Sequence, residues 1–240
     1  MSFGISNSVM SRVVQVCTPE LFHQATSSSV VKDVCSQIAD ALESKRRGEM
    51  NNEDFETLKT QLKKRLPILT PHATFRNGRR CNSDAIPSGF SIYDIDHIPN
   101  PRGYWEEKKK LLAEKKLEVV SGALQSPASK EPASSKQIIS VLDLIVLVHV
   151  TPSSEGLRLV FIIPDGMSLA DAQKWMSQQL GDEEYDVCVK DLARPSFIVP
   201  EDYILFINNE ELFKERKVTY SLAGGCKSPE RLAGANIQSN

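Results

Sequence analysis

The sequence has no excess of charge of either sign, because 29 Lys and Arg residues face 31 Asp and Glu residues and the formal net charge is −2. A global basic field that attracts nucleic acid is therefore excluded, and any such contact needs a local patch. The five cysteines are an odd number and include no Cys-x-x-Cys pair. A zinc site or a disulfide framework is therefore not expected. We expect reduced thiols in a cytoplasmic protein.

Long hydrophobic runs and the common glycine-rich motifs are also missing. The longest apolar run, residues 138–150, is interrupted by Ser140 and Asp143 and is too short to span a bilayer. The first residues have no basic start followed by an apolar segment, so we expect no signal peptide. No Walker A loop, Gly-x-Gly-x-x-Gly or Gly-x-Ser-x-Gly occurs. The short apolar run and the missing signal segment together predict no contact with a membrane.

The apolar pattern indicates both helices and strands. Apolar residues at helical spacing predict a helix over residues 30–46 and a second helix after Asn52. Short apolar runs predict strands at 89–95, 145–150 and 157–163. Hairpins combined with packed helices favour an α+β domain on an antiparallel or mixed sheet.

Composition changes along the chain predict the domain limits. We expect one domain over residues 28–216, with a small, polar, Pro-containing insertion loop at about 122–136. Residues 1–27 are polar and weakly patterned, so we expect a flexible N-terminal segment. The Gly- and Ser-rich residues 217–240 are expected to be a disordered tail.

Two aspartates, Asp94 and Asp96, stand at the end of the apolar strand 89–95. Residues two apart on a strand point to the same face, so the carboxylates are expected side by side. Neighbouring carboxylates repel each other unless a cation bridges them, and Mg²⁺ prefers one or two carboxylates with water and substrate phosphates. The pair is therefore a candidate metal site. Two solvated acids at a strand end are the alternative.

A Ser- and Gly-containing turn, residues 151–156, separates two apolar strands. The hydroxyls of Ser153 and Ser154 and the backbone N–H groups near Gly156 can hold an anion. Arg158, on the strand that leaves the turn, can bind phosphate through its two-pronged guanidinium. A β-turn followed by a surface arginine is the alternative.

A third group of charged residues lies at 186–194. Asp191 and Arg194 are three apart, which suits a local ion pair on a helical turn. Asp186 or Asp191 can equally supply a third carboxylate to the metal site, and Lys190 adds a cation.

In this order, the segments Ser88 to His97, Thr151 to Arg158 and Asp191 to Arg194 resemble the VirE N-terminal-type domain. That domain is a distant member of the archaeo-eukaryotic primase/primase–polymerase superfamily, found mostly in proteins of bacterial mobile elements. The resemblance covers roughly residues 50–215, with an insertion at 117–143. It implies an RRM-like catalytic core flanked by helices.

The resemblance also implies roles for single residues. Asp94 and Asp96 match the paired acids that hold Mg²⁺ or Mn²⁺, and Asp186 or Asp191 matches the third acid. Residues 153–158 match the nucleotide-binding turn, and Lys190 and Arg194 are the further cations expected at the phosphates. The implied partners are nucleoside triphosphates, single-stranded or primed nucleic acid, and a separate helicase-like ATPase.

The sequence departs from the superfamily at Arg158, where active members usually carry a histidine. Arginine can bind a triphosphate, but it cannot exchange protons near neutral pH. A metal-dependent nucleotidyltransferase of primase type and a non-catalytic descendant that binds nucleic acid or a replication protein therefore both remain open. An unrelated α+β protein-interaction module is the third hypothesis.

Overall fold

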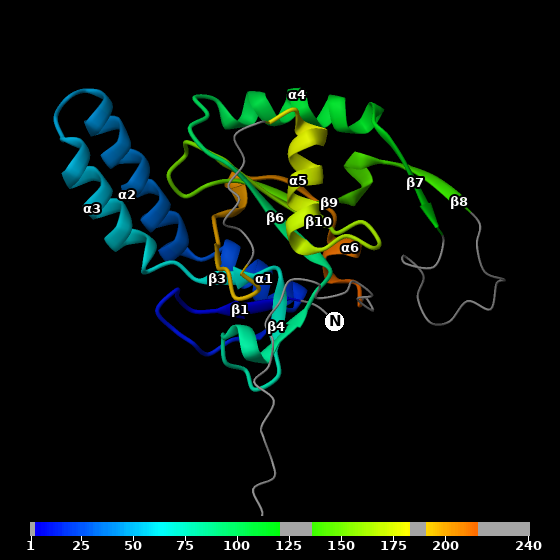
Figure 1. The fold of residues 1–240 in the computed structure, drawn as a ribbon. Coiled ribbons are helices and arrows are strands. Elements are labelled where there is room, and N and C mark those ends of the chain that lie inside the picture. Colours follow the sequence, from blue (N-terminus) through cyan, green and yellow to red (C-terminus); the bar gives the residue numbers. More distant parts are fainter. Residues whose placement is uncertain (1–2, 121–135, 183–190, 216–240) are drawn as a thin grey trace, which may run out of the picture.

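The computed structural model describes residues 3–120, 136–182 and 191–215. These residues form an α+β fold with antiparallel strand pairs, as the sequence predicts. Figure 1 shows two sheets, one above the other, with a helical hairpin projecting from one side.

The central sheet has the strand order β12-β9-β10-β6 and is antiparallel throughout. Its strands follow the apolar runs of the sequence: β6 (Phe90–Ile95), β9 (Ile145–Val150), β10 (Leu157–Ile162) and β12 (Ile204–Ile207). Every residue of β9 is buried. Strands with so few exposed positions need cover on both faces of the sheet.

Two helices cover one face of this sheet, α4 (Pro101–Glu114) and α5 (Leu169–Leu180). Each begins at a side-chain cap: the Asn100 side chain accepts from the Gly103 N–H, and the Ser168 hydroxyl accepts from the Asp171 N–H. Their buried residues join those of the strands in one cluster that includes Tyr93, Leu159, Trp105 and Met176.

The other face packs on a second sheet with the order β11-β3-β1-β2. Its strands are short: β1 (Gly4–Ser6), β2 (Gln15–Val16), β3 (Ile68–Thr70) and β11 (Ser196–Phe197). Helices α1 (Pro19–Thr26) and α6 (Asn209–Phe213) add Phe22 and Leu212 to this layer. Phe90 and Val160 lie on this face, and so do Asp94 and Arg158, which are an even number of residues away from them.

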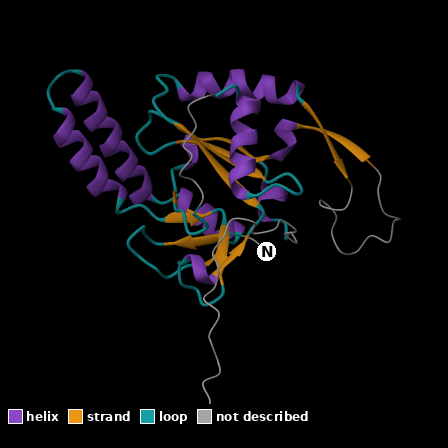
Figure 2. Cartoon of the chain, in the orientation of Figure 1, coloured by secondary structure: helices purple, strands orange, loops and turns teal. Residues whose placement is uncertain are grey.

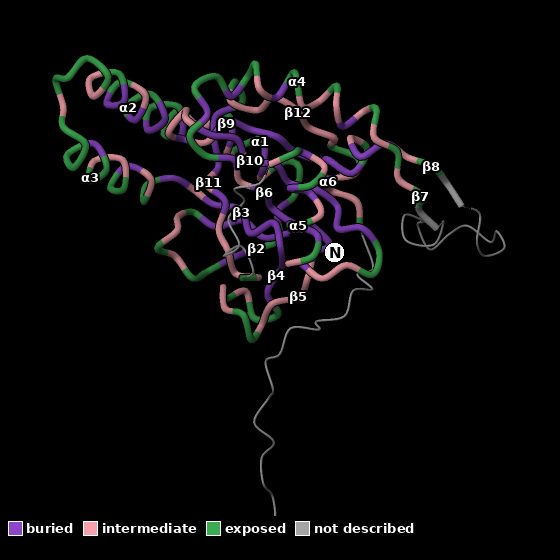
Figure 3. The backbone as a smooth tube through the Cα atoms, turned by 45° about the horizontal axis from the view of Figure 1, so that its top comes forward, coloured by how far each residue is buried: buried purple, intermediate pink, exposed green. Residues whose placement is uncertain are grey.

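The projecting hairpin consists of α2 (Ser29–Arg46) and α3 (Asn52–Lys63). The buried side of α2 packs on α3 and the residues after it, through Ile38, Leu62 and Leu66. Figure 3 shows that the outer surfaces of both helices are exposed while the central strands are buried. The end of α3 lies next to the second sheet, because Phe197 of β11 packs against the cluster that contains Leu62 and Leu66.

The remaining elements are small. Two further hairpins are β4 (Ala73–Phe75) with β5 (Ala85–Pro87), and β7 (Lys116–Val120) with β8 (Lys136–Ser140). Three 3₁₀ turns complete the fold: η1 (Asn82–Asp84), η2 (Val141–Leu144) and η3 (Glu201–Tyr203). Figure 2 separates these helices, strands and loops by colour.

Two expectations differ from the structure. Residues 3–27 are not a flexible segment, because β1, β2 and α1 pack there and Phe3 and Ile5 are buried. Residues 136–143, whose short pattern of apolar residues predicts a helix, form β8 and part of η2 instead. Residues 122–135 of the expected insertion and the whole of the expected tail, residues 217–240, lie outside the described residues.

Candidate functional site

Three polar side chains form a row across three neighbouring strands of the central sheet. Arg158 on β10 lies directly opposite Asp94 on β6 and opposite His149 on β9. Side chains in such cross-strand pairs lie about 5 Å apart at their Cβ atoms. The register therefore brings together two segments that are 64 residues apart in the sequence.

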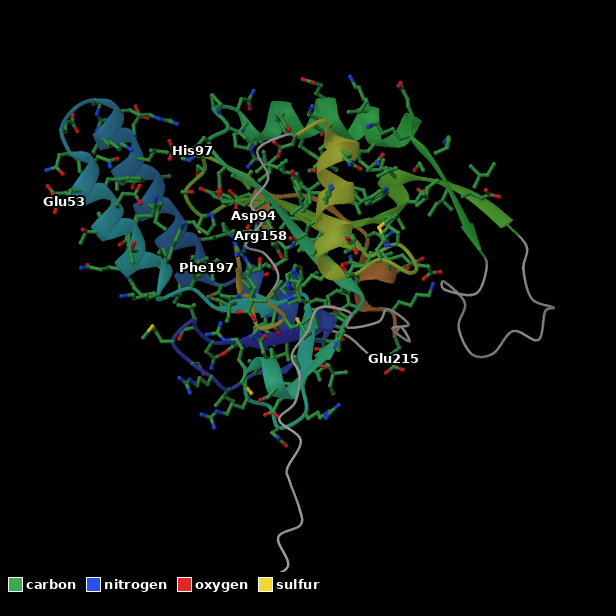
Figure 4. The ribbon with its side chains drawn as sticks, in the orientation of Figure 1. Glu53, Asp94, His97, Arg158, Phe197 and Glu215 are labelled. Carbon is green, nitrogen blue, oxygen red and sulfur yellow. The ribbon has the colours of Figure 1, made fainter. Side chains whose placement is uncertain are left out.

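Arg158 binds both carboxylate oxygens of Asp94. Its Nε lies 2.5 Å from Oδ1 and its Nη2 lies 2.8 Å from Oδ2. Figure 4 shows the two residues side by side, with Phe197 below them. The third nitrogen, Nη1, donates to the carbonyl oxygen of Pro195 at 3.4 Å. The Asp94 side chain is 7% exposed and that of Arg158 is 14% exposed, so the pair is largely withdrawn from water.

Burial by itself would raise the pKa of Asp94, because it penalises the charged form. The charge and hydrogen bonds of Arg158 act more strongly in the other direction, with a contribution from Arg194, so the pKa lies below its usual value. Asp94 is therefore ionised at neutral pH, and the pair is a true ion pair.

Two buried histidines flank the pair as neutral groups. Burial lowers the pKa of His149 and of His72 to about 4 in each case. The Nδ1 of His149 donates to the Val150 carbonyl at 2.9 Å. His72 donates from Nδ1 to the carbonyl of Asp191 and accepts the N–H of Ile92 at Nε2. Through these two hydrogen bonds, His72 connects the backbone of Asp191 to the edge strand β6.

Two more cations approach the same place. The Nη2 of Arg194 lies 3.4 Å from Asp94 Oδ2. The ammonium of Lys63, at the end of α3, lies 5.9 Å from the centre of the Phe197 ring. Burial lowers the pKa of Lys63, and the positive charges of Lys59 and Arg158 act in the same direction. Lys63, Arg158 and Arg194 therefore form a local positive cluster in a chain with a net charge of −2.

Asp96 and the turn at 151–156 lie at the same end of the sheet. A Cβ atom added to Gly156 would stand 2.6 Å from the Ile95 carbonyl, 3.2 Å from Asp96 Oδ1 and 3.3 Å from Thr151 Oγ1. Glycine is thus required for the close approach of the turn to the end of β6. Asp96 is exposed, in contrast to Asp94.

The hydroxyl groups of this turn already have partners within the protein. Ser153 Oγ lies 3.1 Å from Thr151 Oγ1, and Ser154 Oγ lies 3.1 Å from the hydroxyl of Tyr203. Ser154 has a φ of 59°, in the left-handed region that non-glycine residues rarely adopt. The turn is therefore a defined structure next to the end of β6, and its two serine hydroxyls are bound within the protein.

The third acid is less well placed. Asp191 is exposed, and its Oδ1 accepts the N–H of Ala193 at 2.9 Å. Within the described ranges, no group of three or more His, Cys, Asp or Glu side chains is arranged to hold a metal ion. Asp186 and Lys190 lie outside the described residues. Arg194 contacts Asp94, which the predicted local pair with Asp191 did not anticipate.

Sequence reasoning missed His72 and Lys63 as neighbours of the site. His72 follows a proline in a loop, and nothing in its local pattern indicates contact with β6. Lys63 belongs to a run of three basic residues, whose pattern favours a solvated helix end over a phosphate contact. Only the packing of α3 on the 196–199 segment distinguishes the two readings.

Comparisons with protein-family models, with curated proteins and with solved structures find no match to this chain. Among the helices in the described part of the chain, none has both the length and the apolar character needed to cross a bilayer.

Proposed function

We propose that this chain is a primase–polymerase-like domain that binds nucleotide phosphates at the Asp94–Arg158 site, with Mg²⁺ or Mn²⁺ at Asp94 and Asp96. The observation that carries the proposal is the convergence of two strand-end aspartates with the cations Arg158, Arg194 and Lys63. In keeping with the VirE N-terminal-type resemblance, the proposed setting is replication of mobile-element DNA in the cytoplasm, with nucleoside triphosphates, single-stranded or primed nucleic acid and a helicase-like ATPase as partners.

The cations support the phosphate part of this proposal. A guanidinium that binds a carboxylate through two nitrogens has the geometry to bind a phosphate in the same way. Arg158 is held in place by Asp94 and Pro195, so little side-chain entropy is lost when it binds a ligand. Arg194 and Lys63 approach from two other elements and can neutralise further phosphate charge.

Metal binding at Asp94 requires that this carboxylate exchange Arg158 for the metal ion. Mg²⁺ is usually held by one or two carboxylates together with substrate phosphates and water. Asp96 is exposed and suits this role, whereas both oxygens of Asp94 are bound by Arg158. A triphosphate that takes over the guanidinium would leave Asp94 open to a cation. Asp191 or Asp186 is the proposed third acid.

When the β7–β8 hairpin, β11 and the 3₁₀ turns are set aside, the remaining order β6-α4-β9-β10-α5-β12 supports an RRM-like core. It is the strand–helix–strand–strand–helix–strand order of split β-α-β folds. β10 lies between β6 and β9, and β9 lies between β10 and β12. The edge position of β6 is a departure, because the first strand of an RRM is internal.

A second candidate function is a non-catalytic descendant of the same fold that binds nucleic acid or a replication protein. Two observations favour it: Arg158 occupies both oxygens of Asp94, and the Asp191 carboxylate caps its own turn. The two candidates share phosphate binding and differ in whether the metal site works.

Titration calorimetry with a nucleoside triphosphate and Mn²⁺, together with primer extension on a single-stranded template, tests both candidates. We expect Arg158→Gln to weaken triphosphate binding at least tenfold, and Arg47→Gln, an exposed arginine directly after the end of α2, to leave it unchanged. Asp96→Asn should abolish extension, whereas Asp33→Asn on α2 should not.

The outcomes separate the candidates. Extension that depends on Asp96 identifies a nucleotidyltransferase. Triphosphate binding without extension, unaffected by Asp96→Asn, identifies the non-catalytic descendant. Triphosphate binding that is absent, or equal in Arg158→Gln and the wild-type chain, contradicts phosphate binding at the Asp94–Arg158 site and with it the first candidate.

A further inference from the structure

Arginines without ionic partners gather at one end of the second sheet. Six of the ten described arginines have partners in the protein: Arg46 and Arg47 pair with glutamates, Arg80 and Arg102 donate to backbone carbonyls, and Arg158 and Arg194 pair with Asp94. Four exposed arginines in the described ranges have no ion pair or side-chain hydrogen bond to the protein, namely Arg12, Arg65, Arg76 and Arg79. Three of these four belong to the β1–β2 loop and the β4–η1 turn.

Backbone contacts join these two loops. The N–H of Val14 donates to the Gly78 carbonyl at 2.8 Å, and the N–H of Arg80 donates to the Arg12 carbonyl at 2.8 Å. Val13 and Arg79 form an antiparallel bridge. The backbones of residues 12–13 and 79–80 therefore run side by side, with Arg12 beside Arg80 and Val13 beside Arg79, although Arg12 and Arg79 are 67 residues apart in the sequence.

The side chain of Arg80 stabilises the contact between these two loops. Its Nη2 donates to the Val9 carbonyl at 2.5 Å, and its Nη1 is buried without a hydrogen bond within the described part of the chain. We define the arginine surface as the exposed side chains of Arg12, Arg76 and Arg79, supported by Arg80. Two acids are near the arginine surface. Asp84 follows Arg79 closely in the sequence and accepts a hydrogen bond from Asn77, and Asp191, whose charge acts on Arg80, accepts one from the N–H of Ala193.

Exposed apolar side chains accompany the arginine surface. Five large hydrophobic residues are strongly exposed in the described ranges, and three of them, Met10, Val13 and Val16, lie in the same hairpin as Arg12. Val13 is 74% exposed and Met10 is 70% exposed. Unpaired cations and exposed apolar groups at one place indicate a surface that contacts a partner.

The backbone at this place is already used. Residues 12–14 pair with residues 78–80, so a peptide cannot add as a further strand there. Recognition must therefore run through side chains, which are guanidinium forks and short apolar groups. That combination suits a polyanion with apolar parts between its charges.

We propose that the arginine surface binds the phosphate backbone of single-stranded nucleic acid, with Val13 and Met10 against sugars and bases. The choice of nucleic acid among polyanions rests on the proposed function, whereas the surface is separate from Asp94 and Arg158. Arginine contacts to phosphate make binding depend on salt, with a slope of about −0.7 per contact in a plot of log K against log salt concentration for single strands.

Fluorescence anisotropy with a labelled single-stranded oligonucleotide, at salt concentrations from about 50 to 200 mM, tests the proposal. The test variant replaces Arg12, Arg76 and Arg79 by Gln. All three are exposed, so the fold is expected to be retained. We expect the dissociation constant to rise at least tenfold and the salt slope to fall by about 2, from three lost contacts.

The matched control replaces Arg46, Arg47 and Arg65 by Gln, which changes the net charge equally. Equal loss in both variants, or no oligonucleotide binding by the wild-type chain, overturns the proposal. Binding to phosphatidylserine vesicles without oligonucleotide binding also overturns it. If triphosphate binding fails while oligonucleotide binding still depends on the arginine surface, only the proposed function is lost.

Discussion

Arg158 holds Asp94 across two neighbouring strands through two hydrogen bonds, of 2.5 and 2.8 Å, in a largely buried place. Replacing one member of a buried ion pair costs more than the pair contributes, because the other charge remains buried alone. The same relationship ties the stability of the sheet to the chemistry of the proposed site.

Asp94→Asn should lower the free energy of unfolding by about 3–5 kcal/mol, because it leaves Arg158 without its counter-charge. Asp96→Asn, two residues further on and exposed, should change it by less than about 0.5 kcal/mol. Urea denaturation followed by circular dichroism measures both. Equal effects of the two substitutions would show that the ion pair is not formed in solution.

Stability should fall on mild acidification because of His72 and His149. Their folded pKa of about 4 lies below the ordinary value of 6.5, so the unfolded chain takes up protons first as the pH falls. Their contribution is fully present above pH 6.5 and is lost as the pH falls towards 4. Between pH 7 and pH 5 we expect a loss of about 2 kcal/mol per histidine.

His149→Leu removes one of these two groups and should reduce the loss between pH 7 and pH 5 by about 2 kcal/mol. Denaturant unfolding at the two pH values measures the difference. The lowered pKa of Asp94 does not interfere, since its contribution is lost only at more acidic pH. An unchanged loss in His149→Leu would mean that this histidine is accessible to protons in the folded chain.

Gly156→Ala should disturb the turn between β9 and β10. The added methyl group would stand 2.6 Å from the Ile95 carbonyl, which belongs to the rigid end of β6. We expect a loss of about 1–3 kcal/mol in unfolding free energy and weaker triphosphate binding. Ser154→Gly, which relieves a φ of 59° in the same turn, should not destabilise the chain by a comparable amount. Thermal unfolding of the two variants distinguishes them.

Arg158→Gln should strengthen binding of Mn²⁺ in the absence of nucleotide, because the guanidinium competes with the metal for Asp94. We expect at least a tenfold lower dissociation constant, measured by paramagnetic resonance of free Mn²⁺ at pH 7.5. Arg47→Gln serves as the control. An unchanged dissociation constant would remove Asp94 from the proposed metal site and leave the arginine's role in phosphate binding untouched.

Local pattern was sufficient for the central sheet. The apolar runs at 89–95 and 145–150 coincide with β6 and β9. The second sheet was not predictable in this way. Its strands have two or three residues, and β3 pairs with β11, more than 120 residues later, so no local window holds the signal.

Part of the predicted set of site residues lies close together, but the contacts among these residues were not predicted. Asp94, Asp96, Arg158 and the 151–156 turn do lie at one end of the sheet, since β6 and β10 are neighbours. The ion pair itself depends on strand register, because a shift of one residue would turn Arg158 to the other face. Likewise, the contact between Arg194 and Asp94 depends on how residues 194–197 return to β3.

Because β3 pairs with β11, this part of the second sheet can form only late in synthesis of the chain. The ribosome releases residues 68–70 long before residues 196–197, so the edge of β3 stays uncovered through most of synthesis. Open strand edges invite association with other chains, and contacts so distant in sequence close slowly. Premature termination before residue 196 should therefore yield aggregating fragments rather than smaller folded proteins.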